Sequence, residues 1–229
     1  MRDFAVIIPV RLNSKRLRRK ILKKIGNYRV IEVLLKRLKF LPKNLKIIFA
    51  VSDHKSSTEF INYCRIKKIN IFVGSKNNVA LRMLNCANFL SVKNIIRING
   101  DSPLTDPKEI LLFIKKFKLL KCDLLTNIFP RSYPKGMSIE IFKTSILKNN
   151  INKFSFFQKE HVTSYFYKKS KIFKIKNIEK KDNYSNISFA IDQKKDLILL
   201  KKILKNSKFK FNSNLINLIN IYLKVQTKS

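Results

Sequence analysis

A run of seven residues near the start of the chain, Phe4–Val10, is apolar or small throughout and rich in β-branched side chains. Such a run is typical of a strand buried on both faces of a parallel sheet. The next ten residues carry six cations: Arg11, Lys15, Arg16, Arg18, Arg19 and Lys20. Open α/β sheets bind ligands in the loops that follow the carboxyl ends of their strands. This junction therefore predicts an α/β fold with a ligand site in its first loop.

The chemistry of the basic loop favours a polyanion. Arginine offers a planar fork to phosphate oxygens, and lysine offers a point charge. The loop contains neither a Walker motif nor a G-x-G-x-x-G fingerprint, so side chains must hold the phosphates with little help from a glycine nest. The alternative is a solvated basic turn in a chain that is basic everywhere.

The first half of the chain alternates between strand and helix patterns with short connections. Helical spacing of apolar residues follows the basic loop over 30–38, around 60–64 and over 79–90, and Pro107 suits the first turn of a further helix with Asp106 as its N-cap. Further buried strands are predicted at 46–51, 70–73, 94–98 and 122–126. This order predicts a Rossmann-like open, mostly parallel sheet with helices on both faces. We expect one domain over residues 1–229.

The second half is less regular. A loop with two prolines and a glycine covers 127–136. Strands are predicted at 138–142, 171–178 and 187–191, and helices at 160–167, 193–204 and 215–223. We expect this half to form a small β/α extension of the sheet.

Composition limits the other classes of function. The formal charge of +36 comes from cations spread over the whole chain, and the chain is also rich in Ile, Asn and Phe, as a strong AT bias in coding DNA would produce. We therefore expect no specific nucleic-acid binding. No apolar run is long enough to span a membrane, no signal peptide is recognisable, and the three cysteines suit a reducing compartment. The cytoplasm is the expected location.

Two aspartates follow predicted strands. Asp101 comes after the strand at 94–98 and Gly100, so its carboxylate should project beside the basic loop. A carboxylate next to phosphate is repulsive unless a metal lies between them, which makes Asp101 a candidate Mg²⁺ ligand and Asp192 a sensible second one. The alternative for each is an Asx turn or a helix cap. Since Asp192 directly precedes a helix, spacing alone favours capping there.

Four other side chains are open to more than one interpretation. Glu140 lies within a strand pattern, where it is either outward-facing and inert or inward-facing and paired with a cation or ligand. His161 could contact a substrate or be a partly buried structural histidine. Arg82 and Arg97 could reach a phosphate or carboxylate, although Arg82 is expected on a solvated polar helix face.

Five motifs, in order, resemble the cytidylyltransferases that make CMP-sugars from sialic acid, Kdo and related acids. IIPVRLNSKRLRRKIL resembles I-P-A-R-x-x-S-x-R-L-P-x-K, and IRINGDSPLTDP resembles R-x-x-G-D-x-P-L-x-D-P. YPKGMSIEIF, EHVTSYFY and FAIDQKKDLILLKKI resemble P-x-G-L-x-V-E-V-F, E-H-V-T-x-Y-x-Y and V-D-x-x-x-D-L, most like the branch of spore-coat polysaccharide biosynthesis protein F. The motifs span residues 5 to about 204. The chain departs from the family pattern at Val10, Arg18, Asn78 and Ser138, and none of these is a proposed metal ligand.

The resemblance implies a nucleotidyltransferase domain that uses CTP, a sugar acid and Mg²⁺ and releases pyrophosphate, for surface polysaccharide synthesis. By matching positions, Arg11, Ser14, Arg16 and Lys20 would hold the triphosphate, and we add Lys15, Asp53 and Arg82 to the nucleotide site. Lys20, Arg11 and Asp101 would be catalytic, Asp101 and Asp192 would hold Mg²⁺, and Glu140 and His161 would lie near the sugar. The resemblance also implies a homodimer, with about 127–185 as the substrate and dimerisation part. The alternatives are a nucleotidyltransferase that uses another NTP or a sugar phosphate acceptor, and a basic nucleic-acid-binding protein.

Overall fold

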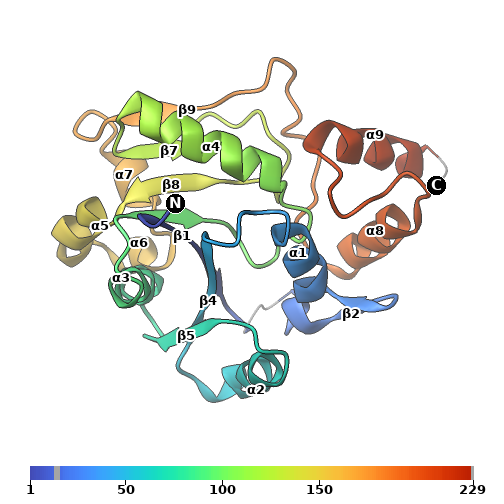
Figure 1. Cartoon of the computed structure of the whole chain (residues 1–229), viewed down its shortest axis with the longest axis horizontal. Coiled ribbons are helices and arrows are strands. Elements are labelled where there is room, and N and C mark those ends of the chain that lie inside the picture. Colours follow the sequence, from blue (N-terminus) through green and yellow to red (C-terminus); the bar gives the residue numbers. More distant parts are fainter. Residues whose placement is uncertain (13–15, 228–229) are drawn as a thin grey trace.

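A seven-stranded twisted sheet forms the centre of the molecule in the computed structural model, which describes residues 1–12 and 16–227 (Figure 1). The strand order is β5-β4-β1-β6-β8-β7-β9. The strands are β1 (Phe4–Val10), β4 (Lys46–Ser52), β5 (Ile71–Gly74), β6 (Asn94–Arg97), β7 (Leu124–Thr126), β8 (Glu140–Lys143) and β9 (Ile175–Asn177). A separate two-stranded hairpin, β2 (Lys24–Ile25) with β3 (Tyr28–Arg29), follows the basic loop.

The sheet is mostly parallel, as the alternating pattern predicted. β1 pairs in parallel with β4 on one side and β6 on the other, so that Ile7 faces both Ile48 and Arg97. β8 is antiparallel to both of its neighbours, β6 and β7. Because the four strands β5, β4, β1 and β6 run in one direction, their carboxyl ends meet at one edge of the sheet.

Helices cover both faces of the sheet, as predicted (Figure 1). They are α1 (Val30–Leu38), α2 (Thr58–Ile66), α3 (Val79–Phe89), α4 (Pro107–Leu120), α5 (Thr144–Asn150), α6 (Phe156–Glu160), α7 (Ser164–Lys168), α8 (Lys194–Lys205) and α9 (Leu215–Gln226). The α4 N-cap is Asp106, whose side chain accepts a hydrogen bond from the Lys108 N–H at 2.8 Å, as the sequence predicted.

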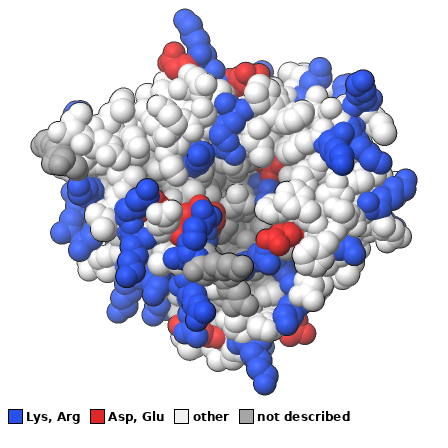
Figure 2. Space-filling model, turned by 180° about the vertical axis from the view of Figure 1, so that it is seen from behind, with Lys and Arg blue, Asp and Glu red and all other residues white. Residues whose placement is uncertain are grey.

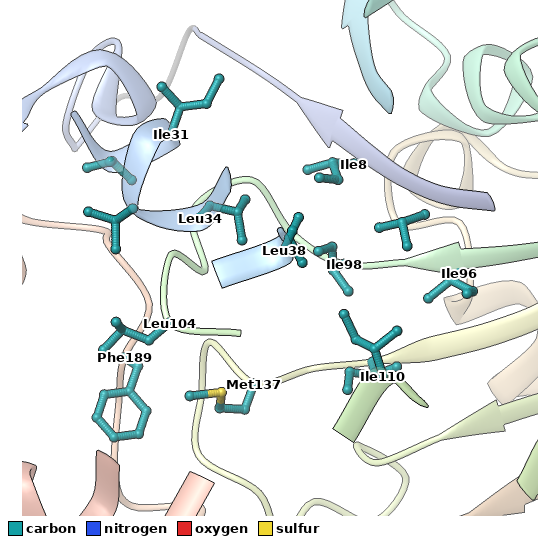
Figure 3. Close-up of a cluster of buried hydrophobic side chains, with 14 of the residues drawn as sticks. Ile8, Ile31, Leu34, Leu38, Ile96, Ile98, Leu104, Ile110, Met137 and Phe189 are labelled. Atoms are coloured by element: carbon teal, nitrogen blue, oxygen red, sulfur yellow. The ribbon is translucent and has the colours of Figure 1, made fainter. Parts of the chain in front are cut away.

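Alternate residues of β1 enter two separate hydrophobic clusters, because successive side chains of a strand point to opposite faces. Val6 and Ile8 pack in the cluster that includes α1, α4, α8 and α9, part of which Figure 3 shows around Ile8, Leu34 and Ile110. Ala5 and Ile7 pack with α3, α5 and α7 on the other face. Burial on both faces explains the uninterrupted apolar run that opens the sequence.

The second half of the chain differs from its predicted elements in three places. The strand predicted at 171–178 is shortened to β9, and 187–191 is an extended segment with only a β-bridge between Ser188 and Lys135. The helix predicted at 160–167 is broken, since α6 ends at Glu160 and α7 begins at Ser164. At 187–191 the alternating pattern reflects burial of Ile187, Phe189 and Ile191 and not regular strand pairing, whereas Ile172, before β9, is largely exposed.

The cysteines, the surface charges and the helix lengths bear on the remaining predictions. All three cysteines are buried and unpaired, as expected. Figure 2 shows Lys and Arg side chains scattered over the face in view, with carboxylates among them and no single basic stripe. Within the described residues no helix is long and apolar enough to cross a membrane. The single domain and the assignment of about 127–185 to dimerisation stay predictions.

Candidate active site

A cavity of about 600 Å³ opens at the carboxyl ends of β1 and β6. Its volume lies within the range of ligand sites, which is roughly 300–1,000 Å³. The basic loop, the segment after β6, the break between α6 and α7 and the segment before α8 all contribute to it. Its lining includes Pro9, Val10, Arg11, Arg16, Lys20, Ile21, Val79, Arg97, Asn99, Gly100, Asp101, Glu160, His161 and Asp192. The structure thus gathers most of the predicted site residues in one place.

Lys20 is held in this cavity by the fold of the basic loop. The backbone N–H of Arg19 donates to the carbonyl of Leu12 at 3.1 Å, which closes the loop, and Lys20 begins a short 3₁₀ helix. The next residue, Ile21, is buried and anchors that helix. A Cβ on Gly100 would lie 3.1 Å from the Ile21 side chain, so the glycine allows the loop to pack close to the end of β6.

The Lys20 ammonium joins the two predicted metal ligands. Its Nζ lies 2.5 Å from Oδ2 of Asp101 and 2.9 Å from Oδ1 of Asp192. Burial opposes the charge on Lys20, but the two carboxylates together outweigh burial and raise the pKa of Lys20 above its usual value. Burial likewise opposes the charge on Asp192, but Lys20 and Arg16 lower the pKa of Asp192 overall. Lys20 and Asp192 are therefore both charged at neutral pH.

Asp192 is brought to Asp101 by a backbone contact and not by a helix cap. The N–H of Ile191 donates to the carbonyl of Asp101 at 2.9 Å. The N-cap of α8 is Gln193, and the Asp196 side chain accepts from the backbone N–H groups of both Asp192 and Gln193. The capping role that spacing favoured for Asp192 is therefore wrong, and its carboxylate is free to face the cavity.

The donor set at this point suits Mg²⁺. Asp101 and Asp192 direct oxygens at one cationic atom, which demonstrates that both can face a single positive charge. Mg²⁺ is commonly bound by one or two carboxylates together with phosphate oxygens and water. The described residues contain no group of three or more His, Cys, Asp or Glu side chains that could hold a metal ion. The site therefore fits a metal that arrives with a phosphate ligand better than a fully protein-coordinated metal.

Other cations of the basic loop also contact cavity acids. Arg16 lies 3.4 Å from Oδ2 of Asp192, and Arg11 forms an ion pair with Glu160. Both arginines remain more than half exposed, so both are available to a ligand. The predicted contacts from Ser14 and Lys15 fall outside the described residues.

His161 lies in the break between α6 and α7. Its backbone N–H donates to the backbone carbonyl of Phe157, and its backbone carbonyl accepts from the Ser164 hydroxyl at 2.5 Å. Burial first, and then the charges of Arg97 and Arg11, lower the pKa of His161 below its usual 6.5. The imidazole is therefore neutral at neutral pH and can accept a proton within the cavity.

Glu140 takes the inward-facing alternative. Its side chain is 1% exposed and forms an ion pair with Arg97, while the Tyr167 hydroxyl donates to its other oxygen. Glu140 does not line the cavity itself, but its partner Arg97 does. Glu140 therefore contacts a residue of the cavity wall, Arg97, and not the cavity itself.

Two of the predicted nucleotide contacts lie away from the cavity lining. Asp53 is exposed just beyond β4. Arg82 is fully buried in α3, so its expected position on a solvated helix face is wrong. Its Nη1 donates to the carbonyl of Ser75 at 2.6 Å, and no described residue partners its Nε or Nη2. The small Gly74 allows this packing, because a Cβ there would lie 3.2 Å from Cγ of Arg82.

Residues that the sequence did not single out complete the site. Asn99 lines the cavity two positions before Asp101, and Tyr167 fixes Glu140 from α7. The signal for Tyr167 was present as an aromatic run next to Glu160 and His161, but an aromatic run alone more often indicates core packing. Its partner could only be found once β8 and α7 were placed together.

Comparison with known proteins decides the family. A model of the family described as Cytidylyltransferase matches residues 5–222. The chain belongs to the cytidylyltransferase family. It is 34% identical to an uncharacterised protein of Methanocaldococcus jannaschii, over 87% of this chain and 82% of the relative. Identity to the spore coat polysaccharide biosynthesis protein SpsF of Bacillus subtilis is 25%, over 89% and 87% of the two chains.

Two further relatives support the same assignment. A 3-deoxy-manno-octulosonate cytidylyltransferase of Rickettsia bellii is 29% identical, over 73% of each chain. Among solved structures, a cytidylyltransferase from Leptospira borgpetersenii superposes with a TM-score of 0.92 at 25% identity, covering 98% of this chain and 95% of that one. Both the resemblance and the cytidylyltransferase activity that it implied are therefore supported.

Proposed function

We propose that this cytidylyltransferase transfers CMP from CTP to a hydroxyl group of a sugar acid, with Mg²⁺, and releases pyrophosphate. The observation that carries the proposal is the convergence of Lys20, Asp101 and Asp192 in a cavity walled by Arg11 and Arg16. This arrangement offers cations to a triphosphate and two carboxylates to a metal that bridges to it. The acidic acceptor is favoured by the relative named as a 3-deoxy-manno-octulosonate cytidylyltransferase.

The reaction requires charge stabilisation more than covalent catalysis. The acceptor oxygen forms a bond to the α-phosphorus while the bond from that phosphorus to the bridging oxygen breaks. The pyrophosphate leaves with the electron pair of the broken bond. Arg11, Arg16 and Lys20 would hold the phosphates in line and offset the negative charge that develops on the leaving group.

The acceptor hydroxyl must also lose its proton. Among the described titratable side chains of the cavity, Glu160, Asp101 and Asp192 are engaged in ion pairs, whereas His161 is neutral and has no ion-pair partner. His161 is therefore our candidate for the group that takes the proton.

Asp101 and Asp192 would hold Mg²⁺, which supplies positive charge to the phosphate oxygens when bound. Lys20 contacts both carboxylates, so it would have to exchange at least one of these contacts for a phosphate oxygen when the nucleotide binds. Asp101 and Asp192 would in this way contact Lys20 before the nucleotide binds and Mg²⁺ afterwards.

Pyrophosphate release tests the proposal. The full chain would be assayed with Mg²⁺ and CTP, UTP, ATP or GTP in separate reactions, each against sialic, legionaminic, pseudaminic and Kdo-type acids. We expect release with CTP and at least one acid. Release with another NTP would overturn the nucleotide assignment. Release only with a sugar phosphate in place of the acid would overturn the acceptor assignment.

A further inference from the structure

Arg97 and Glu140 face each other across two antiparallel strands at the inner wall of the cavity. They are register partners in β6 and β8, and Nη1 of Arg97 forms an ion pair with Oε2 of Glu140. The Tyr167 hydroxyl donates to Oε1 of Glu140 and also lies 2.9 Å from the Thr126 hydroxyl. Both oxygens of the buried carboxylate are thus occupied, and Arg97 is held in one orientation.

A second guanidinium makes this buried cluster positive. Arg131 donates to the Ser138 hydroxyl at 3.1 Å, and the Glu140 carboxylate partly offsets the lowering of the Arg131 pKa by burial. Two arginines thus act on one carboxylate, which leaves one formal positive charge. Arg131 is only half-buried, and the excess positive charge beside the cavity attracts an additional anion.

The Arg97 guanidinium has hydrogen-bonding capacity that its protein partners do not use. Its Nε is buried without a hydrogen-bond partner among the described residues, and its only side-chain bond there uses Nη1. The Arg97 side chain is 17% exposed and lines the cavity, close enough to His161 to lower the pKa of that imidazole. The part of the guanidinium that reaches the cavity can donate charge-assisted hydrogen bonds to a carboxylate.

We propose that Arg97 determines acceptor specificity by binding the carboxylate of the sugar acid with the part of its guanidinium that lines the cavity. The inference rests on the proposed function and assigns it a recognition residue. We assign Arg97 to the acceptor and not to a CTP phosphate, because its ion-pair partner Glu140 lies in β8 and not in the basic loop. Glu140 and Tyr167 are positioning residues that act through Arg97.

The test compares an acid acceptor with its methyl ester, which has the same sugar but no negative charge. Removal of Arg97 alone would leave Glu140 buried and unpaired, so the main variant is the double substitution Arg97→Gln with Glu140→Gln. Arg65→Gln is the matched control, because Arg65 is exposed on α2 and does not line the cavity. Glu140→Gln alone keeps the guanidinium and reports on its positioning. Arg97→Lys is a second variant that keeps the charge and loses the fork. CTP binding, measured by calorimetry, reports on fold and nucleotide site in every protein.

We expect the wild-type chain and Arg65→Gln to prefer the acid over its ester by about 100-fold in kcat/KM, as loss of a charged hydrogen bond predicts. Glu140→Gln should show a reduced preference, because the guanidinium remains but is no longer held in one orientation. The double variant should lose this preference through a raised KM for the acid, with CTP affinity unchanged. Arg97→Lys should lose most of it.

Three outcomes would overturn the inference. A double variant or Arg97→Lys variant that keeps the preference would show that Arg97 does not read the carboxylate. A variant with weakened CTP binding and an unchanged preference would make Arg97 a phosphate ligand. Wild-type turnover with neutral sugars or sugar phosphates, but with no acid, would refute the acceptor class in the proposed function, and the inference with it.

Discussion

The backbone N–H of Ile191 donates a hydrogen bond to the carbonyl oxygen of Asp101, with 2.9 Å between the two atoms. This bond joins segments that lie about 90 residues apart and brings Asp192 beside Asp101. The segment 187–191 is held from its other end by Lys135, whose N–H donates to Ile187 and whose carbonyl accepts from Phe189. The position of one candidate metal ligand therefore depends on the loop that contains Gly136.

Gly136→Ala should destabilise the protein and displace Asp192. The φ of Gly136 is +85°, and a Cβ there would lie 2.5 Å from the backbone nitrogen of Ala190. We expect the free energy of unfolding to fall by about 3 kcal/mol, more than backbone strain alone would cost, and the turnover to fall with it. Denaturant unfolding measures the first effect.

Gly26→Ala is the matched control for this substitution. Gly26 also has a positive φ, +58°, but no atom lies within 4 Å of a Cβ built there. Its cost should be limited to about 1 kcal/mol of backbone strain. Equal losses in the two variants would contradict the close approach between Gly136 and the segment before Asp192.

Lys20→Met should change how stability depends on pH. In the wild type, the raised pKa of Lys20 gives stability that is lost as pH rises beyond 10.5, and the lowered pKa of Asp192 gives stability that is lost as pH falls below 3.8. Without the ammonium, Asp192 loses the partner that contributes most to lowering its pKa. The variant should therefore lose less stability than the wild type as pH falls below 3.8.

Thermal unfolding between about pH 3 and pH 5 measures this change, and Lys23→Met provides the control. Lys23 is exposed and its replacement removes the same charge. If Lys20→Met and Lys23→Met had the same pH profile, the two aspartates would not depend on Lys20 for their neutralisation.

His161→Gln should remove the acid limb of the pH–rate profile. Because the pKa of His161 is lowered below 6.5, the wild-type rate should fall only as pH drops beneath that value, where the imidazole becomes protonated. The variant should be about 100-fold slower and should lack this limb. His54→Gln is the control, since His54 bonds to Ser56 and does not line the cavity. An unchanged limb in His161→Gln would exclude His161 as the base.

Asp101→Asn should lower turnover by at least about 100-fold with little loss of stability, because a neutral amide cannot balance Lys20 or bind Mg²⁺ as a carboxylate does. Circular dichroism checks the fold, and titration with Mn²⁺ in the presence of CTP measures metal binding. Near-wild-type turnover would remove Asp101 from the metal site.

The sequence predicted the parallel part of the sheet well because its central strand is buried on both faces and leaves an uninterrupted apolar signal. That strand is Phe4–Val10. The segment 187–191 has a similar composition, yet it forms only one bridge, since its hydrogen bonds go to Lys135 and Asp101. Local pattern reports burial and does not report which backbone group is the partner.

The same limit applies to the site. Lys20 and Asp101 were predictable because each follows the carboxyl end of a buried strand. The spacing left Asp192 open as a helix cap or a metal ligand. The structure excludes the cap, because the Asp196 side chain accepts from the backbone N–H groups at the start of α8. Arg82 was misplaced since the sequence gives no sign that a charged side chain on an amphipathic helix is buried.

Identification of the product tests the central claim most directly. Mass spectrometry of a reaction with the full chain, CTP, Mg²⁺ and the acid panel should reveal a CMP-linked sugar acid and an equal amount of pyrophosphate. Neither product should form with Asp101→Asn. If wild-type protein that binds CTP yields a nucleotide-linked product of any other class, or no sugar-linked product with any acid, the assignment as a CMP-sugar-acid synthetase is contradicted.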